Sequence, residues 1–361
     1  MKFDIRKLLG GIIIVIVLAF LFFRSDQLAQ LAETVQKGAI VPVVIAIVTQ
    51  LTKYFFQSFA YTSAFKAIGE SYKFLSSALL VFGTFFMNTI APSLNMAGTS
   101  LVIDEARRRG IAAGKATSAA ILMQMSVESG FMVIMFLGFA ILAVFGLLDP
   151  AWLALGLIVV ALVLVMLTLL SLGTRKPKLL RKIFGFATKL ANKVRAKFNK
   201  KPLSAWEDKM VSSLAEAWTL IKKNPKHTAK VFGYSALASA CELSCFCLVG
   251  LAFGVTNIQA LISGYVLATL FAMISITPQG VGVVEAVVAL SFSAFGVLPT
   301  TGVAIALVYR GLVFWMPFLI GAIVIQKAKF FSKKKTSQET DDSGIGASDE
   351  EHINSPENYR P

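Results

Sequence analysis

The chain has 361 residues, of which 56% are hydrophobic and only 15% are charged, and its formal net charge is +15. A soluble globular domain carries about 25% charged residues, so this composition excludes a soluble fold and predicts an all-α polytopic membrane protein. The basic residues occur in short segments between long apolar runs, not along one face of a soluble domain. We therefore expect no nucleic acid among the partners.

Six apolar runs are predicted to cross the membrane. A hydrocarbon core of about 30 Å needs about 20 helical residues at about 1.5 Å each. Basic residues precede the first run, as in a signal peptide, but no small-residue cleavage site follows it, so we predict an uncleaved span. The predicted spans are residues 8–23, 40–63, 116–148, 151–172, 228–255 and 302–326.

Two further apolar segments, residues 74–103 and 257–298, contain helix-breaking residues near their middle. Basic residues flank both ends of the first segment and also follow the last span, so the positive-inside rule places both ends of the first segment in the cytoplasm and both ends of the second outside. We predict two broken hairpins, each entering and leaving by one face; the alternative is two complete short crossings per segment. The breaks contain Asn88, Pro92, Asn95 and Gly98 in the first segment, and Pro278, Gln279, Gly280 and Gly282 in the second.

The order span, span, broken hairpin, span occurs twice with opposite orientation. This order predicts an inverted repeat, the architecture of many secondary transporters; the alternative is a pair of kinks in ordinary packed helices. Both termini are predicted to be cytoplasmic. The predicted domains are a first repeat at 1–148 with hairpin 74–103, the first span of a second repeat at 149–172, a basic amphipathic insert at 173–227, the rest of the second repeat at 228–327 with hairpin 257–298, and a disordered tail at 328–361.

The basic insert is predicted to form two amphipathic helices. Apolar residues recur at helical spacing between lysines and arginines over 179–198, and Ser204 and Glu207 have the spacing of a capping box at the start of a second helix. We interpret the pair as an interfacial hairpin on an anionic membrane surface. The alternative is a linker packed on the protein with a solvated basic face.

Five ionisable residues fall within the apolar runs. Each would cost roughly 2.5–3.5 kcal/mol at the centre of a membrane helix, so they should face one another or a polar cavity. We expect Glu285 to pair with Arg310; the alternative role of that pair is purely structural. Glu128, one helical turn after Gln124, is a further candidate, whereas Lys53 and Glu242 are weaker ones because they could lie nearer an interface.

The second break and the last span together resemble the closing signature of the lysylphosphatidylglycerol synthase transmembrane-region family, also called flippase-like domain proteins. The matching residues are Pro278 to Glu285, Tyr309 with Arg310, and Pro317, and Asn88, Pro92 and Gly98 resemble an element of the family's first half. Val281 stands where the family usually has glycine. The likeness covers most of residues 5–330 and implies movement of a phospholipid, anionic or aminoacylated, across a membrane.

The best-known member of that family, the multiple peptide resistance factor, joins the membrane region to a soluble transferase domain. Only about 35 residues follow residue 326 here, and they lack the apolar content to fold. We therefore expect no lysyltransferase activity even if such a name is applied by resemblance. The sequence also lacks a nucleotide-binding loop, a catalytic triad and a set of metal ligands, so we expect no enzyme, no cofactor and no metal.

The sequence is compatible with two functions. The first is a multi-pass cytoplasmic-membrane protein that translocates a phospholipid or related lipid-linked substrate; the second is a non-catalytic membrane component of a lipid or polysaccharide pathway that partners a separate lipid-modifying enzyme. A homo-oligomer fits either function. The residues expected to bind substrate or couple its transport are Asn88, Pro92, Asn95, Gln124, Glu128, Pro278, Gln279, Gly280, Gly282, Glu285 and Arg310.

Overall fold

The computed structural model describes residues 39–90, 96–144, 146, 150–197, 207–274, 280 and 282–327. All regular elements in these ranges are helices, and no strand occurs among the residues described. The all-α prediction is therefore confirmed for this part of the chain. The predicted first span at 8–23 and the predicted tail at 328–361 lie outside the described residues.

Four helical segments are long and apolar enough to cross a membrane, and they coincide with four of the six predicted spans. These are α3 (Ile40–Ala67), α6 (Ala113–Val144), α10 (Pro225–Ala252), and a continuous segment made of α13 (Pro299–Arg310), the π-helical turn η2 (Gly311–Trp315) and α14 (Met316–Lys327). A further predicted span, residues 151–172, lies within the helix α7 (Pro150–Arg175). The protein is thus built from several membrane-length helices.

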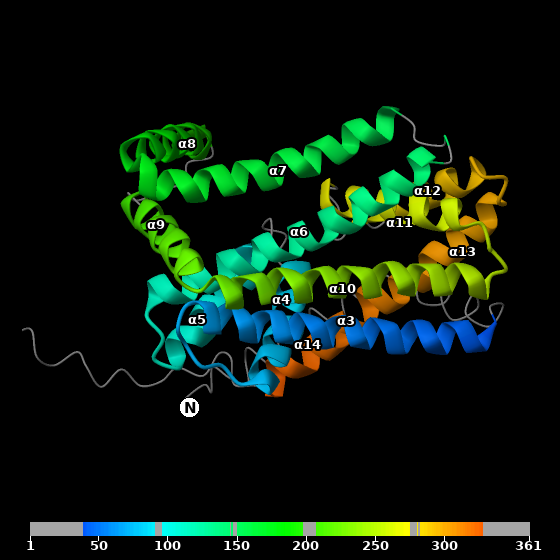
Figure 1. The fold of residues 1–361 in the computed structure, drawn as a ribbon, viewed down its shortest axis with the longest axis horizontal. Helices are drawn as coiled ribbons and strands as arrows, with labels where there is room; N and C mark the ends of the chain where they lie inside the picture. Colours follow the sequence, from blue (N-terminus) through cyan, green and yellow to red (C-terminus); the bar gives the residue numbers. More distant parts are fainter. Residues whose placement is uncertain are drawn as a thin grey trace, which may run out of the picture. The chain divides into compact units, whose positions relative to one another are not determined.

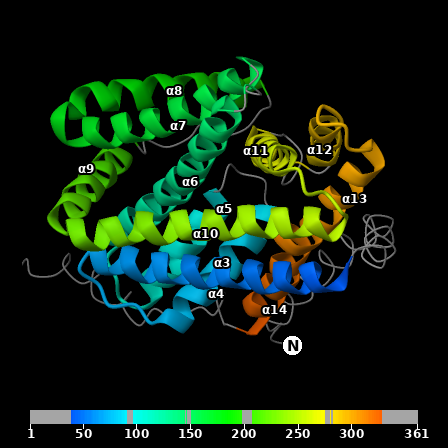
Figure 2. The ribbon, with the colours of Figure 1, turned by 45° about the vertical axis from the view of Figure 1, so that its right-hand side comes forward.

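Helices α3 and α10 lie side by side along their whole length (Figures 1 and 2). At one end, the backbone N–H of Ala39 donates to the carbonyl oxygen of Ala252 at 2.8 Å. At the other end, the side-chain amide of Asn224 donates to the carbonyl oxygen of Ala67 at 2.7 Å. Because the start of each helix meets the end of the other, the two helices are antiparallel.

Each predicted break separates two helices that form a hairpin. The first hairpin consists of α4 (Phe74–Ile90) and α5 (Met96–Arg108), whose outer ends meet where Arg109 donates to Ser76 Oγ at 2.9 Å. The second consists of α11 (Ile258–Ile274) and α12 (Val283–Ser293), which pack on each other. Short connections join α3 to α4 and α10 to α11, so the hairpins enter at opposite ends of the α3–α10 pair.

The insert forms α8 (Pro177–Lys197) and α9 (Glu207–Lys223), which lie next to the C-terminal end of α7 (Figure 1). The apolar side chains of α9, including Ala217, pack against α6, which corresponds to the packed-linker alternative. In contrast, α8 leaves Leu179, Ile183 and Phe186 exposed. The predicted capping residue Ser204 lies outside the described residues.

Small residues let the helices approach closely at several crossings. A Cβ on Gly130 of α6 would lie 2.7 Å from the carbonyl carbon of Ser235 on α10, and one on Gly321 of α14 would clash with the carbonyl oxygen of Phe82 on α4. Close backbone contact of this kind is a common basis for helix association in membranes, where burial of apolar surface gives little driving force. These crossings fix α6 and α4 around the site described next.

Candidate functional site

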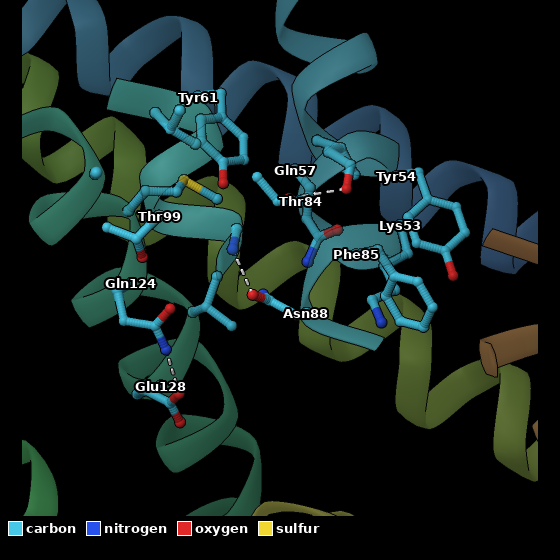
Figure 3. A pocket seen from close by; sticks show the side chains of 16 residues that line it. Lys53, Tyr54, Gln57, Tyr61, Thr84, Phe85, Asn88, Thr99, Gln124 and Glu128 are labelled. Carbon is cyan, nitrogen blue, oxygen red and sulfur yellow. Dashed lines mark hydrogen bonds between the residues drawn. The ribbon is translucent and has the colours of Figure 1, made fainter. Parts of the chain in front are cut away.

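A polar cavity of about 210 Å³ lies among α3, α4, α5 and α6. Figure 3 shows the side chains that line it, and its labels include the charged groups Lys53 and Glu128. An apolar protein keeps such a cavity in its interior only where polar groups can hydrogen-bond or bind a ligand. Its polar side chains are Lys53, Tyr54, Gln57, Tyr61, Thr84, Asn88, Thr99, Gln124 and Glu128.

Helix α6 presents Gln124 and Glu128 to this cavity from consecutive turns. The Gln124 Nε2 amide donates to Glu128 Oε1 at 2.7 Å. Between them in sequence, Ser126 points to the other side of α6, where it accepts a hydrogen bond from Ser235 Oγ of α10 at 2.9 Å. The contact with α10 therefore fixes the rotation of α6 and keeps Glu128 on the cavity side.

Asn88, near the end of α4, closes one side of the cavity. Its Oδ1 accepts a hydrogen bond from the backbone N–H of Gly98 in α5 at 2.7 Å. A Cβ on Gly98 would come within 2.7 Å of the Asn88 amide, so glycine allows this approach. The hydrogen bond ties together the two helices on either side of the first break.

Lys53 of α3 pairs with Glu242 of α10, and the sequence did not predict this pair. Its Nζ lies 2.6 Å from Glu242 Oε1 on α10, and both side chains are largely buried. Lys53 is 13 residues from the start of α3 and 14 from its end, so it lies at the middle of this helix. Its depth relative to a membrane interface stays a prediction. The sequence indicates that both residues are buried, because each lies well inside its predicted span. It does not indicate that they pair, because they are 189 positions apart.

The second half of the chain holds a separate charged cluster. Glu285 Oε1 lies 3.1 Å from Arg310 Nε, and the side chains are only 11% and 8% exposed, respectively, so the expected pair is present. The other carboxylate oxygen accepts the backbone N–H of Gly282 at 2.7 Å. Gly280 and Gly282 have φ values of 70° and 84°, which glycine adopts without strain. The pair therefore anchors the start of α12 to α13.

The structure divides the predicted site residues into two groups. Asn88, Gln124 and Glu128 meet in the cavity, whereas Gly280, Gly282, Glu285 and Arg310 do not line it. Four further predicted residues, Pro92, Asn95, Pro278 and Gln279, lie outside the described residues. Lys53, Tyr54 and Gln57 join the cavity from α3, although the sequence reasoning did not place them there.

The described lining of the cavity offers hydrogen-bonding groups and one charged group of each sign. In the part of the chain that the structure describes, no three His, Cys, Asp or Glu side chains come together as metal ligands would. The cysteines Cys241, Cys245 and Cys247 are free thiols on α10. The arrangement suits reversible binding of a polar or charged group.

A search of curated proteins found no match. The model of the family described as lysylphosphatidylglycerol synthase TM region matches residues 8–321, which is most of the chain. The region matched is the transmembrane part, in accord with the membrane-length helices and the resemblance noted in the sequence. The chain therefore belongs to the lysylphosphatidylglycerol synthase TM region family.

Proposed function

We propose that this protein translocates a phospholipid or related lipid-linked substrate across the cytoplasmic membrane. The observation that carries the proposal is the polar cavity, which places Lys53 and Glu128 among helices of membrane-spanning length. Ionisable groups inside a membrane usually mark a substrate or ion pathway because their burial is otherwise unfavourable. A path for a polar headgroup accounts for their presence in this apolar chain.

The size of the cavity favours a headgroup over a whole lipid. A volume of about 210 Å³ is below the range of roughly 300–1,000 Å³ typical of pockets that enclose a drug-sized ligand. The amide and hydroxyl groups of the lining could replace water around a headgroup, while the acyl chains stay in the bilayer. The cavity is therefore of a size to hold the polar headgroup of a lipid but not its acyl chains.

An inverted repeat would supply the alternating access that translocation needs. Helix contacts of the first half have counterparts in the second half. Helix α3 packs on α4, as α10 packs on α11; helix α5 packs on α6, as α12 packs on α13. Helix α4 packs on α14 of the other half, as α11 packs on α6. The antiparallel α3 and α10, with hairpins entering at opposite ends, support the opposite orientation of the halves. Two such arrangements can open one site to either side.

The two hairpins fit the re-entrant interpretation better than complete crossings. Helix α5 has 13 residues and α12 has 11. At about 1.5 Å per residue these helices are about 20 and 17 Å long, against a hydrocarbon core of about 30 Å. Short helices of this kind end inside the membrane, where the polar backbone of the breaks needs protein or a wet cavity around it.

Lipid transfer by the purified protein tests the proposal. Liposomes would carry tail-labelled fluorescent phospholipids with neutral, acidic or aminoacylated headgroups, and dithionite would quench the label in the outer leaflet. We expect protein-dependent loss of the protected inner-leaflet signal for at least one headgroup. If folded protein gives no loss for any of them, the second function, a membrane component that needs a separate lipid-modifying enzyme, takes its place.

The same assay tests the proposed roles of Glu285 and Arg310. Glu285→Gln and Arg310→Ala would each be reconstituted after size-exclusion chromatography has shown that the protein is folded. Loss of transfer in folded variants would support substrate binding or coupling by this pair. Normal transfer in both variants would leave it the structural role of anchoring α12 to α13.

A further inference from the structure

The charged groups at the cavity do not balance. Among the residues that the structure describes, Lys53 and Glu128 are the only charged side chains in its lining, and Lys53 is already in contact with the carboxylate of Glu242. If all three groups were ionised, two negative charges would accompany one positive charge. An excess charge in the membrane interior is unfavourable by several kcal/mol, so this group of residues needs one more positive charge.

Glu128 is where the unbalanced charge resides. Among the described residues its carboxyl group has one hydrogen-bond partner, the Gln124 amide at Oε1, and no ion-pair partner. Its second oxygen is left to accept a proton. The partly buried side chain faces a space large enough for several water molecules, since a water takes up about 30 Å³ in the liquid.

Within the described lining of the cavity, the elements around α6 bring Lys53 as the one further charge. From α3, the titratable groups at the cavity are Lys53, Tyr54 and Tyr61; α4 and α5 contribute neutral polar groups such as Asn88 and Thr99. Helix α10 contributes Glu242, which Lys53 neutralises.

The charged residues of the helices packed on the other sides of α6, among them Glu216, Lys222 and Lys223 of α9 and Lys226 and Lys230 of α10, do not line the cavity. Helix α11 has Tyr265 as its one titratable side chain, and α7 has none before Arg175. On α9, Glu216 contacts Gly114, which precedes Glu128 by about 21 Å along the helix axis.

We propose that Glu128 is the proton-binding site of this protein, protonated when the cavity is closed and deprotonated when the cavity opens to water. The reaction is the release of one proton from the carboxyl group to water and its return on closure. This inference rests on the proposed function, because proton exchange at Glu128 would couple lipid translocation to the proton gradient. The Lys53–Glu242 pair keeps the rest of the site neutral throughout.

Infrared titration of the protein in liposomes tests the protonation state directly. We expect wild-type protein to show, near neutral pH, the carbonyl stretching band of a protonated carboxylic acid that disappears as the pH is raised. The band should be missing in Glu128→Gln and present in Glu70→Gln, whose carboxylate lies between α3 and α4 and pairs with Lys115 in the first turn of α6. Equal bands in wild type and Glu128→Gln at every pH would overturn the proposal.

A second variant, Gln124→Leu, should shift the titration of the band without removing the band, so the test does not depend on the folding of Glu128→Gln alone. Gln124→Leu removes the amide that donates to Glu128 and that stabilises the ionised carboxylate. The loss of the band should therefore move to higher pH. A titration that stays where it was in wild type would contradict the assignment of the band to Glu128.

Transport measurements separate this inference from the proposed function. Transfer by wild type should fall as the pH rises on both sides, since the closed state needs the proton, whereas transfer by folded Glu128→Gln should no longer vary with pH. A lack of transfer by wild type would remove the proposed function, while the infrared band still decides whether Glu128 binds a proton. Equal pH profiles in the two proteins would overturn the coupling.

Discussion

The two charged sites of this protein differ in how completely they are closed. Glu285 and Arg310 are both almost fully buried and contact each other, and Gly282 satisfies the second carboxylate oxygen. Glu128 instead faces a cavity and has an amide, not a cation, as its hydrogen-bond partner. A closed pair is suited to holding helices together, whereas an open carboxylate can exchange a proton or meet a ligand. The comparison assigns different roles to residues that the sequence alone presents as equivalent.

Removing Arg310 should have the largest effect on stability. Arg310→Ala leaves Glu285 buried without its cation, and breaking a buried pair in this way costs about 3–5 kcal/mol. Thermal unfolding in detergent would measure the loss. The matched control is Lys115→Ala, which breaks a more exposed pair with Glu70 and should cost about 1 kcal/mol or less. Similar losses in both variants would contradict the closed character of the Glu285–Arg310 pair.

The Lys53–Glu242 pair should behave as a single unit. Lys53→Met and Glu242→Gln should each destabilise the protein by about 3 kcal/mol, because each leaves a largely buried group without its partner. The double variant should lose less than the sum of the two losses, with a coupling of about 0.5–3 kcal/mol in a double-mutant cycle of unfolding. Simple additivity would show that the contact between α3 and α10 does not depend on this pair.

A smaller effect is expected where α6 crosses α10 beside the cavity. Gly130→Ala places a Cβ 2.7 Å from the Ser235 backbone and should destabilise the protein by about 1–3 kcal/mol through overpacking. The control is Gly233→Ala on α10, where a Cβ meets no atom within 4 Å and alanine favours the helix. The prediction fails if the two melting temperatures shift together.

The smallest effect concerns α8, where the interfacial prediction is still to be tested. Phe186 is 71% exposed on a helix rich in lysine and arginine. A polarity-sensitive dye on Phe186→Cys should shift to shorter emission wavelengths in vesicles with anionic lipid than in neutral vesicles, because the apolar face enters the interface. The same dye on Arg181→Cys, an exposed position about 140° around the helix from Phe186, should shift less. Equal shifts would favour a solvated linker.

The sequence predicted the helices well because their determinants are local. The apolar runs and the break residues define where α4 ends and where α12 begins, and membrane burial makes an unpaired charge unfavourable wherever it lies. The Glu285–Arg310 pair was predictable for the same reason, since the two residues lie in adjacent segments.

The cavity was not predictable, because it depends on contacts between distant parts of the chain. Glu242 reaches Lys53 only through the antiparallel packing of α3 and α10. Gln57 and Thr84 carry no charge and give no sign in the sequence that they line a cavity. The separation of Glu128 from Arg310 likewise depends on how the helices pack on one another. The periodicity of apolar residues in the sequence does not predict that packing.

The account's central claim, that a lipid headgroup passes through this cavity, is tested most directly by filling it. Ala120 lines the cavity on α6, and Ala140 is exposed on the same helix. In the dithionite assay, folded Ala120→Phe should transfer lipid no faster than protein-free liposomes, while Ala140→Phe should match wild type. Wild-type transfer by folded Ala120→Phe would contradict the claim and place the path elsewhere.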